Sequence, residues 1–327
     1  MTVTGLDALT EADVAAFRTL HGRVVDTVES ALRGKRAVVE LVTVAMFAGG
    51  HVLLEDVPGT GKTTLARSLA AALGGLSRRV QFTPDLLPSD VTGTSVYDPQ
   101  SGEIRFRPGP VFSNVVLADE INRAAAKTQS ALLEVMEEHT VTVDGVGHTV
   151  PDPFVVIATQ NPIDLDGTYR LPEAQLDRFL VRTAIGYPDG EHEVEVLRPG
   201  SGAGAVASVA TVTSPEQVAA HAAALQRLHV AEPILHYIRA VGAATRQDPR
   251  LRLGASTRSL RGLVRCIQAY AAAQGRHYVV PSDVQRLVGP VLAHRMVLTR
   301  ESLLAGETSE GVLDDVVARV DVPRPSP

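Results

Sequence analysis

Two glycines, a lysine and three threonines lie close together near residue 60, in an order that suits phosphate binding. The run Pro58-Gly-Thr-Gly-Lys-Thr-Thr64 comes after the apolar residues 52–54 and before residues 65–73, whose leucines recur at helical spacing. Such a loop delivers backbone N–H groups to a helix N-terminus, where the helix dipole favours an anion. The order strand, loop and helix therefore predicts a P-loop, which binds the phosphates of a nucleotide.

The side chains of this loop have separate expected roles. Lys62 supplies a mobile positive charge for the β and γ phosphates, and the Thr63 hydroxyl is placed to bind Mg²⁺. The usual pattern begins with glycine where this chain has Asp56, so close approach to the phosphates depends on Gly59 and Gly61. We predict that the nucleotide is bound by Pro58, Gly59, Thr60, Gly61, Lys62, Thr63 and Thr64.

Polar residues also end two apolar segments further along the chain. Asp119 and Glu120 follow the apolar run 115–118, so we expect Asp119 to hold Mg²⁺ through its water shell and Glu120 to polarise the attacking water. Asn161 ends the run that begins at residue 154, and strand ends line the ligand crevice of an open α/β sheet. Asn161 is therefore expected to orient water near the γ-phosphate. In isolation, the acidic pair would suggest a helix cap and Asn-Pro a turn.

Two arginines could supply positive charge to the same reaction. Arg178 comes shortly after the Asn161 segment, and Arg258 opens a helical pattern in a second region of the chain. A guanidinium is permanently charged and binds phosphate oxygens through two donors at once, which suits a phosphoryl-transfer transition state. Either arginine could equally be a solvated surface residue or part of a structural ion pair.

Together these segments resemble the MoxR family of AAA+ ATPases, over about residues 35 to 300. The matching segments are Glu55-Asp-Val-Pro-Gly-Thr-Gly-Lys-Thr63, Ala118-Asp-Glu-Ile-Asn-Arg-Ala124, Lys127-Thr-Gln-Ser-Ala-Leu-Leu-Glu134, Ala158-Thr-Gln-Asn-Pro162, Leu171-Pro-Glu-Ala-Gln-Leu-Asp-Arg-Phe179 and Gly254-Ala-Ser-Thr-Arg258. Tyr169-Arg170 stands where the family usually has Tyr-Pro, and Thr257 and Ser259 replace its usual Pro and Ala. None of these departures falls on a charged catalytic position.

The resemblance assigns a role to each candidate residue. It places Lys62 and Thr63 in Walker A, and Asp119 and Glu120 in Walker B. It makes Asn161 the sensor 1 residue, and Arg258 the sensor 2 residue on a lid helix that can swing onto the nucleotide. It makes Arg178 an arginine finger that reaches the nucleotide of a neighbouring subunit. It also implies ATP and Mg²⁺ as cofactors, and a homo-oligomeric ring that is expected to be a hexamer.

The expected fold is α/β, a P-loop AAA+ parallel sheet sandwiched by helices, with a C-terminal all-helical lid. We expect helical patterns in the lid at Pro215 to Leu228, Glu232 to Thr245, Thr257 to Gln274 and Ser282 to Val297. The domain boundaries that we predict are a helical arm at 1–34, the core at 35–198, a linker at 199–213, the lid at 214–320 and a disordered tail at 321–327.

Two short segments read as hairpins. Asp98-Pro-Gln-Ser-Gly102 separates two β-prone runs, and Asp144-Gly145 marks a turn in a second such pair. By themselves they could be edge decoration. The resemblance makes Asp98 to Phe106 and Val141 to His148 candidate loops for contacting a substrate or partner, because insertions at these places project toward the ring pore in the family.

The composition limits the class of protein. The chain has 327 residues, 45% of them hydrophobic, which allows two domains with a large core. A net charge of −6 argues against a surface that coats nucleic acid. The only cysteine, Cys266, cannot form an intrachain disulfide, and the sequence has neither an apolar run of membrane-spanning length nor a secretory start. We therefore expect a cytoplasmic protein that does not insert into membranes.

Three classes of function fit these residues. The leading one is an ATPase ring that remodels a protein client; the resemblance adds a partner with a von Willebrand factor A domain, and maturation or metal loading of a protein complex. The second is a nucleic-acid-associated motor or transcriptional regulator, disfavoured by the acidic balance and the lack of a Gly-Ala-Phe-Thr-Gly-Ala loop. The third is a nucleotide-sensing scaffold without turnover, which would not need Glu120, Asn161 and Arg178.

Overall fold

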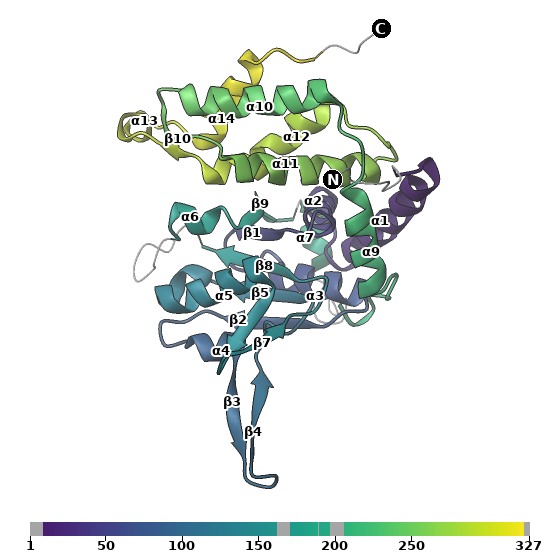
Figure 1. Ribbon diagram of the computed structural model, residues 1–327. Helices are drawn as coiled ribbons and strands as arrows, with labels where there is room; N and C mark the ends of the chain where they lie inside the picture. The colour runs from purple at the N-terminus through teal and green to yellow at the C-terminus, as the bar shows by residue number, and fades with distance from the viewer. Residues whose placement is uncertain (1–8, 162–170, 189, 197–205, 324–327) are drawn as a thin grey trace, which may run out of the picture.

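A five-stranded parallel sheet lies at the centre of the chain (Figure 1). The computed structural model describes residues 9–161, 171–188, 190–196 and 206–323. The strand order is β2-β5-β8-β1-β9. The strands are β1 (His51–Glu55), β2 (Ser77–Gln81), β5 (Val115–Asp119), β8 (Val155–Gln160) and β9 (Phe179–Thr183). This confirms the predicted parallel α/β core.

Helices cover both faces of the sheet, which explains why its inner strands are almost wholly apolar. Successive side chains of β1 alternate between two hydrophobic clusters, since neighbouring residues of a strand point to opposite faces. Val52 and Leu54 pack on one face, and Leu53 packs on the other. The first face carries α1 (Glu11–Ala31), α2 (Arg36–Phe47) and α3 (Lys62–Ala72), and the second carries α4 (Pro88–Thr92) and α5 (Ala126–Glu138).

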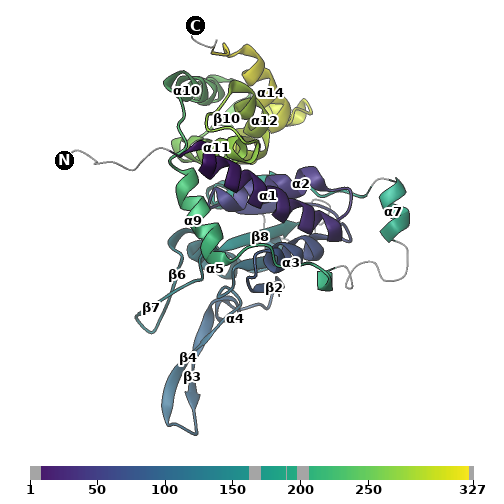
Figure 2. The same ribbon diagram turned by 90° about the vertical axis from the view of Figure 1, so that its right-hand side faces the viewer.

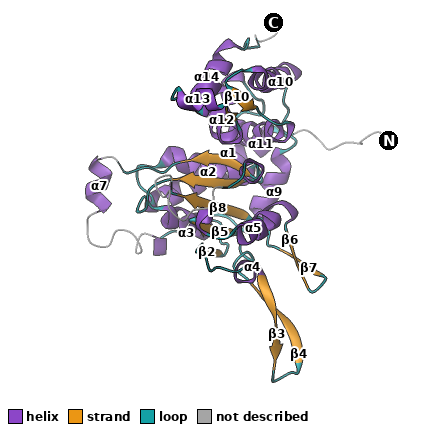
Figure 3. Ribbon diagram, turned by 90° about the vertical axis from the view of Figure 1, so that its left-hand side faces the viewer, coloured by secondary structure: helices purple, strands orange, loops and turns teal. Residues whose placement is uncertain are grey.

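Two antiparallel hairpins extend from the second face, as predicted. The longer pairs β3 (Gly93–Asp98) with β4 (Glu103–Pro108) and projects beyond the rest of the chain (Figure 1). The shorter pairs β6 (Thr140–Val143) with β7 (Val146–Thr149) and lies beside it (Figure 3). Its turn residues Asp144 and Gly145 have φ values of 51° and 79°, the positive values of the tight turn expected from Asp-Gly.

The C-terminal region is mainly helical, and four of its helices were predicted. Helix α9 begins the region, and a small two-stranded sheet and two further helices complete it. Those last four elements were not predicted, and the helical pattern expected at Ser282 to Val297 ends at Leu292, before the short strand Val297–Leu298. The elements are α9 (Pro215–Leu225), α10 (Glu232–Gln247), β10 (Leu251–Leu253), α11 (Thr257–Ala273), α12 (Pro281–Leu292), β11 (Val297–Leu298), α13 (Arg300–Leu304) and α14 (Ser309–Arg319).

The lid packs firmly on the core through α11 and α12. Buried residues of α2, α11, α12 and α14 belong to one continuous hydrophobic cluster. Two buried side chains fix the lid to the start of β9, because His294 Nε2 lies 2.9 Å and Arg295 Nη2 2.7 Å from the carbonyl oxygen of Phe179. The lid therefore has a defined seat at the amino end of β9.

The N-terminal segment and the linker also join this packed body. Helix α1, expected as part of an arm, packs against α2, α3 and α11 (Figure 2). Phe17 meets Phe47 edge to face, with ring centroids 4.8 Å apart. The described end of the linker is bonded to α3, since the N–H groups of Val212 and Thr213 donate to the carbonyl oxygen of Ala72. Residues 1–8, 199–205 and 324–327 of the predicted arm, linker and tail lie outside the described residues.

Four short helical segments complete the part of the chain that the structure describes. The connection after β5 forms a 3₁₀ turn at Ile121–Arg123, a second such turn at Ala293–Arg295 follows α12, and α6 (Glu173–Leu176) precedes β9. Helix α7 (Gly190–Val196) stands at the side of the molecule near the start of α2 (Figure 2). Within the described ranges, every helix is too short or too polar to cross a bilayer.

Candidate nucleotide-binding site

The loop between β1 and α3 has the backbone geometry of a phosphate cradle. Gly59 and Gly61 have φ values of 89° and 96°, which residues other than glycine rarely adopt. A Cβ on Gly61 would lie 2.6 Å from Leu32, so this position also lacks space. Helix α3 begins at Lys62, and its first N–H groups face the loop without partners inside the helix. These features fit a bound phosphate group.

The Lys62 side chain lies along its own loop. Its Nζ donates to the carbonyl oxygens of Asp56 and Val57, at 3.0 and 2.9 Å. These contacts keep the ammonium group next to the cradle, and a phosphate is a stronger partner for it than a neutral carbonyl. The neighbouring Thr60 is buried, whereas Pro58 and Gly59 are exposed.

Asp56 anchors the loop, which explains the residue that departs from the usual pattern. It is 6% exposed, and its carboxylate accepts three backbone N–H bonds. One comes from Val57 at 2.9 Å, and two come from Ile185 and Gly186 after β9, each at 2.8 Å. The carboxylate therefore joins the first bend of the loop to the segment after the neighbouring strand.

Asp119 and Glu120 lie at the carboxyl end of β5, as predicted. Asp119 Oδ1 accepts a bond from the hydroxyl of Thr159 at 2.7 Å, and Oδ2 pairs with Arg79 Nη2 at 2.6 Å. Glu120 has a φ of 55° and donates its N–H to the same Thr159 hydroxyl at 2.8 Å. Thr159 thus fixes the two acidic residues relative to each other.

Two further side chains hold the Glu120 carboxylate. Its Oε2 accepts from Gln81 Nε2 at 3.0 Å and from Arg123 Nη1 at 2.9 Å. Arg79 and Gln81 were missed by sequence reasoning, although their spacing contained a signal. Residues two apart on a strand point to the same side, so both polar side chains of edge strand β2 reach the acidic pair on β5.

Asn161 lies where the end of β8 meets the P-loop. Gln160 pairs with Glu55 in the parallel register, and its carbonyl oxygen accepts the N–H of Asp56 at 3.1 Å. Asn161 follows directly and is partly buried. Because β8 lies between β5 and β1, its end brings Asn161 between the acidic pair and the phosphate loop.

The two candidate arginines lie together at the amino ends of the strands, which we call the amino edge of the sheet, whereas the P-loop lies at the carboxyl ends. Arg178 Nε is 3.0 Å from Glu137 Oε2, and Arg258 Nη1 is 3.0 Å from Glu137 Oε1. Arg178 precedes Phe179, which pairs with His51 at the start of β1. The P-loop follows the other end of β1, about 13 Å along the strand. Arg258 thus lies beside Arg178, at the amino ends of the strands. A sensor 2 residue that acts on the nucleotide of its own chain would instead lie near the P-loop, at the carboxyl ends.

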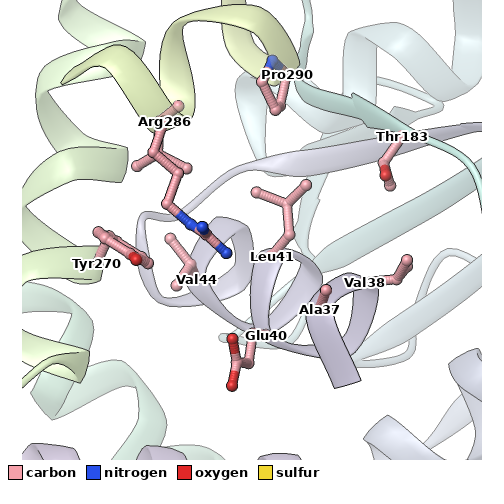
Figure 4. A pocket seen from close by; sticks show the side chains of 10 residues that line it. Ala37, Val38, Glu40, Leu41, Val44, Thr183, Tyr270, Arg286 and Pro290 are labelled. Atoms are coloured by element: carbon pink, nitrogen blue, oxygen red, sulfur yellow. The ribbon is translucent and has the colours of Figure 1, made fainter. Parts of the chain in front are cut away.

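A separate cavity of about 280 Å³ lies at the seam between core and lid (Figure 4). The guanidinium of Arg286 lies 5.5 Å from the centre of the Tyr270 ring. Thr183 contributes to the wall, two residues before the segment that binds Asp56. The lining residues are Ala37, Val38, Glu40, Leu41, Val44, Thr183, Tyr270, Arg286, Leu287 and Pro290.

Comparison with known proteins agrees with this geometry. Residues 51–181 match the model of the ATPase family associated with various cellular activities, and residues 243–316 match an AAA lid domain. The chain is 39% identical to Chaperone MoxR1 of Mycobacterium tuberculosis, over 96% of this chain and 85% of that protein. It is 32% identical to Protein MoxR of Paracoccus denitrificans, over 93% of this chain and 97% of that protein. The chain belongs to the MoxR family of AAA+ ATPases.

This membership makes the protein an ATP-hydrolysing enzyme and confirms the resemblance drawn from its motifs. The same family fold is found in a solved structure of a provisionally assigned ATPase from Cytophaga hutchinsonii. That structure has a TM-score of 0.90 and 36% identity, and the match covers 96% of this chain and 98% of the other. The chain is also 45% identical to the uncharacterised protein YeaC of Bacillus subtilis, over 93% of its length and 95% of the relative.

Proposed function

We propose that this MoxR-family protein is a chaperone-like ATPase that works as a head-to-tail ring in the cytoplasm. Each ATP with its Mg²⁺ lies between the P-loop of one copy and the Arg178 edge of the next. The observation that supports this arrangement is the position of Arg178 and Arg258 on Glu137, at the amino edge of the sheet. A head-to-tail contact joins two different faces and closes into a ring if its rotation permits.

The residues at the carboxyl edge would bind ATP and prepare the water. Residues 58–64 hold the phosphates, with Lys62 on the β and γ groups, and Thr63 and Asp119 are the proposed Mg²⁺ ligands. A bound Mg²⁺ neutralises charge on the phosphates. Glu120 accepts the proton of the attacking water, and Asn161 orients that water. The bonds from Gln81 and Arg123 hold the Glu120 carboxylate in place before the substrate arrives.

Arg178 and Arg258 would complete the site from the neighbouring copy. A guanidinium stabilises negative charge that spreads over the γ-phosphoryl oxygens in the transition state. Both arginines keep exposed surface, 28% of the side chain for Arg178 and 54% for Arg258. We therefore assign Arg258 to the same intersubunit site as Arg178, in place of the nucleotide of its own chain.

The hairpins would transmit the reaction to a protein client. Tyr97 and Ile104 face each other near the tip of the long hairpin and are 61% and 72% exposed. The base of this hairpin is tied to the shorter one, because Phe106 stacks on His148 with centroids 4.0 Å apart and Ser95 donates to Asp144. We propose that the paired hairpins contact the client, with a von Willebrand factor A domain partner, during maturation or metal loading of a protein complex.

Complementation between two inactive variants tests the shared site. Lys62→Ala removes the phosphate contact but keeps the arginines, whereas Arg178→Ala keeps the P-loop but removes the finger. Each variant alone is expected to show little turnover, and a mixture should regain a clear fraction, because mixed interfaces contain one intact half-site from each. Lys62→Ala mixed with the Lys62→Ala/Arg178→Ala double variant is the matched control and should regain none. A failure of the first mixture to exceed this control contradicts the shared site.

Particle mass gives a second, independent measurement. Glu120→Gln retains the shape of the side chain but cannot accept a proton, so it should bind ATP without hydrolysing it. Light scattering in the presence of ATP and Mg²⁺ is expected to show a ring that persists with this variant. A chain that stays monomeric with bound nucleotide would instead support a scaffold without turnover.

A further inference from the structure

A single carboxylate, Glu137, contacts both arginines that the proposed ring requires. It lies in the last turn of α5, two residues before His139 ends the helix and leads into β6. Its two oxygens are used separately, with Oε2 on Arg178 and Oε1 on Arg258. The motifs in the sequence gave this residue no role. One acidic group therefore brings together arginines from two distant parts of the chain.

The nitrogen that Glu137 engages on Arg178 determines what the rest of the group can do. A guanidinium is planar and carries five N–H donors in a fixed fork. The carboxylate binds Nε, next to the side-chain stem, at 3.0 Å. This bond fixes the plane of the group. Among the residues that the structure describes, neither terminal nitrogen has a hydrogen-bond partner, so both can bind a second, bidentate partner. A phosphate is a suitable partner of that kind.

The five ionised side chains of this ion-pair network carry one net positive charge, which attracts anions. Arg258 Nε lies 3.7 Å from Asp177 Oδ2, and the other oxygen of Asp177 lies 3.5 Å from the buried Arg295 Nε. Three guanidinium groups thus share two carboxylates, so one positive charge is left over. The hydrogen bond from Arg178, followed by the charge of Arg258, lowers the pKa of Glu137, so this carboxylate is ionised at neutral pH. Without it, two like charges would repel each other at close range.

We propose that Glu137 is the positioning residue for Arg178 and Arg258, holding both guanidinium groups ready for the nucleotide of the neighbouring copy. This inference rests on the proposed shared site. It adds that Glu137 acts in the copy that donates the arginines, and has no direct part in binding the nucleotide of its own chain. Positioning of this kind removes the need to reorganise the arginines during the reaction.

The complementation mixture can locate this effect in one of the two copies. Glu137→Gln is introduced either into the Lys62→Ala chain, which donates arginines, or into the Arg178→Ala chain, which donates the P-loop. We expect turnover of the mixture to fall about ten- to a hundredfold in the first case, because a small misplacement of a catalytic group has an effect of this size. In the second case turnover should change by less than about twofold, since that chain no longer supplies Arg178.

Two further variants keep the test decisive. Glu138→Gln, at the next exposed position of α5, is the matched control and should change turnover in neither chain. Glu137→Asp keeps the charge but shortens the side chain, so it cannot reach both arginines and should reproduce the one-sided loss even if Glu137→Gln folds poorly. Equal losses in both chains, or no loss in either, would overturn the positioning role while leaving the shared site intact. A parent mixture without any recovered turnover would overturn the shared site itself, and the inference with it.

Discussion

Replacing Asp56 should destabilise the protein and weaken the P-loop together. Asp56→Ala removes an almost fully buried carboxylate and leaves the N–H groups of Val57, Ile185 and Gly186 without their acceptor. A hydrogen bond to a charged group contributes about 1.5 kcal/mol or more, and the two long-range bonds to residues 185 and 186 are the ones that folding creates. We therefore expect the free energy of unfolding to fall by about 3 kcal/mol. Asp56→Asn retains one acceptor oxygen and should lose about half as much.

Urea titration followed by circular dichroism measures this loss, and binding of a fluorescent ATP analogue measures the effect on the loop. Glu134→Ala, at an exposed position of α5, is the control and should change stability by less than about 0.5 kcal/mol. Asp56→Gly restores the usual first residue of the motif, yet we expect it to lower both stability and ATP affinity. If Asp56→Ala were as stable as the control, or Asp56→Gly bound ATP more tightly than wild type, the anchoring role of this carboxylate would be refuted.

Two other predictions concern Arg178 and His51. Arg178→Ala should reduce turnover about a thousandfold with little change in ATP affinity, whereas Lys62→Ala should weaken ATP binding itself, as measured by calorimetry; equal losses of binding would contradict the finger role. Burial lowers the pKa of His51 to about 4, so between pH 6.5 and 4 the unfolded chain takes up a proton that the folded chain does not. This group's contribution is thus present above pH 6.5 and is lost as the pH falls, by about 1.4 kcal/mol per pH unit. Between pH 6.5 and 4, His51→Gln should reduce the slope of unfolding free energy against pH by an amount that corresponds to almost one bound proton. An unchanged slope would contradict the pKa shift.

The carboxyl edge of the sheet could be predicted well, because its residues are adjacent in sequence to the strands that carry them. An apolar run followed by a glycine loop and Lys62, or by Asp119, specifies both the strand and the residue at its end. Parallel pairing then brings these ends together without further information. The candidate positions at residues 58–64, 119, 120 and 161 accordingly all lie at one edge.

The partners of these residues could not be predicted in the same way. Arg79, Gln81 and Glu137 contact residues about 40 positions away in the chain or further, and no local pattern records such contacts. The contact of Arg258 with Glu137 could not be predicted for a related reason. Its helix has a clear start and apolar face, but the seat of the lid is fixed by His294 and Arg295 on the backbone of Phe179, which the spacing of apolar residues does not reveal.

The continuous packing of lid and core has a consequence for how force is generated. Val42 of α2, Ile267 of α11 and Leu287 of α12 are buried in one cluster, so a large rotation of the lid against the core would expose apolar surface to water. Each chain should then move as a stiff block, so in the proposed ring the flexible points would lie at the contacts between chains. A change of nucleotide at one contact must shift the whole neighbouring block and alter the geometry of the next contact. In the proposed ring, hydrolysis at one site would then change the rate at the next site without stopping it.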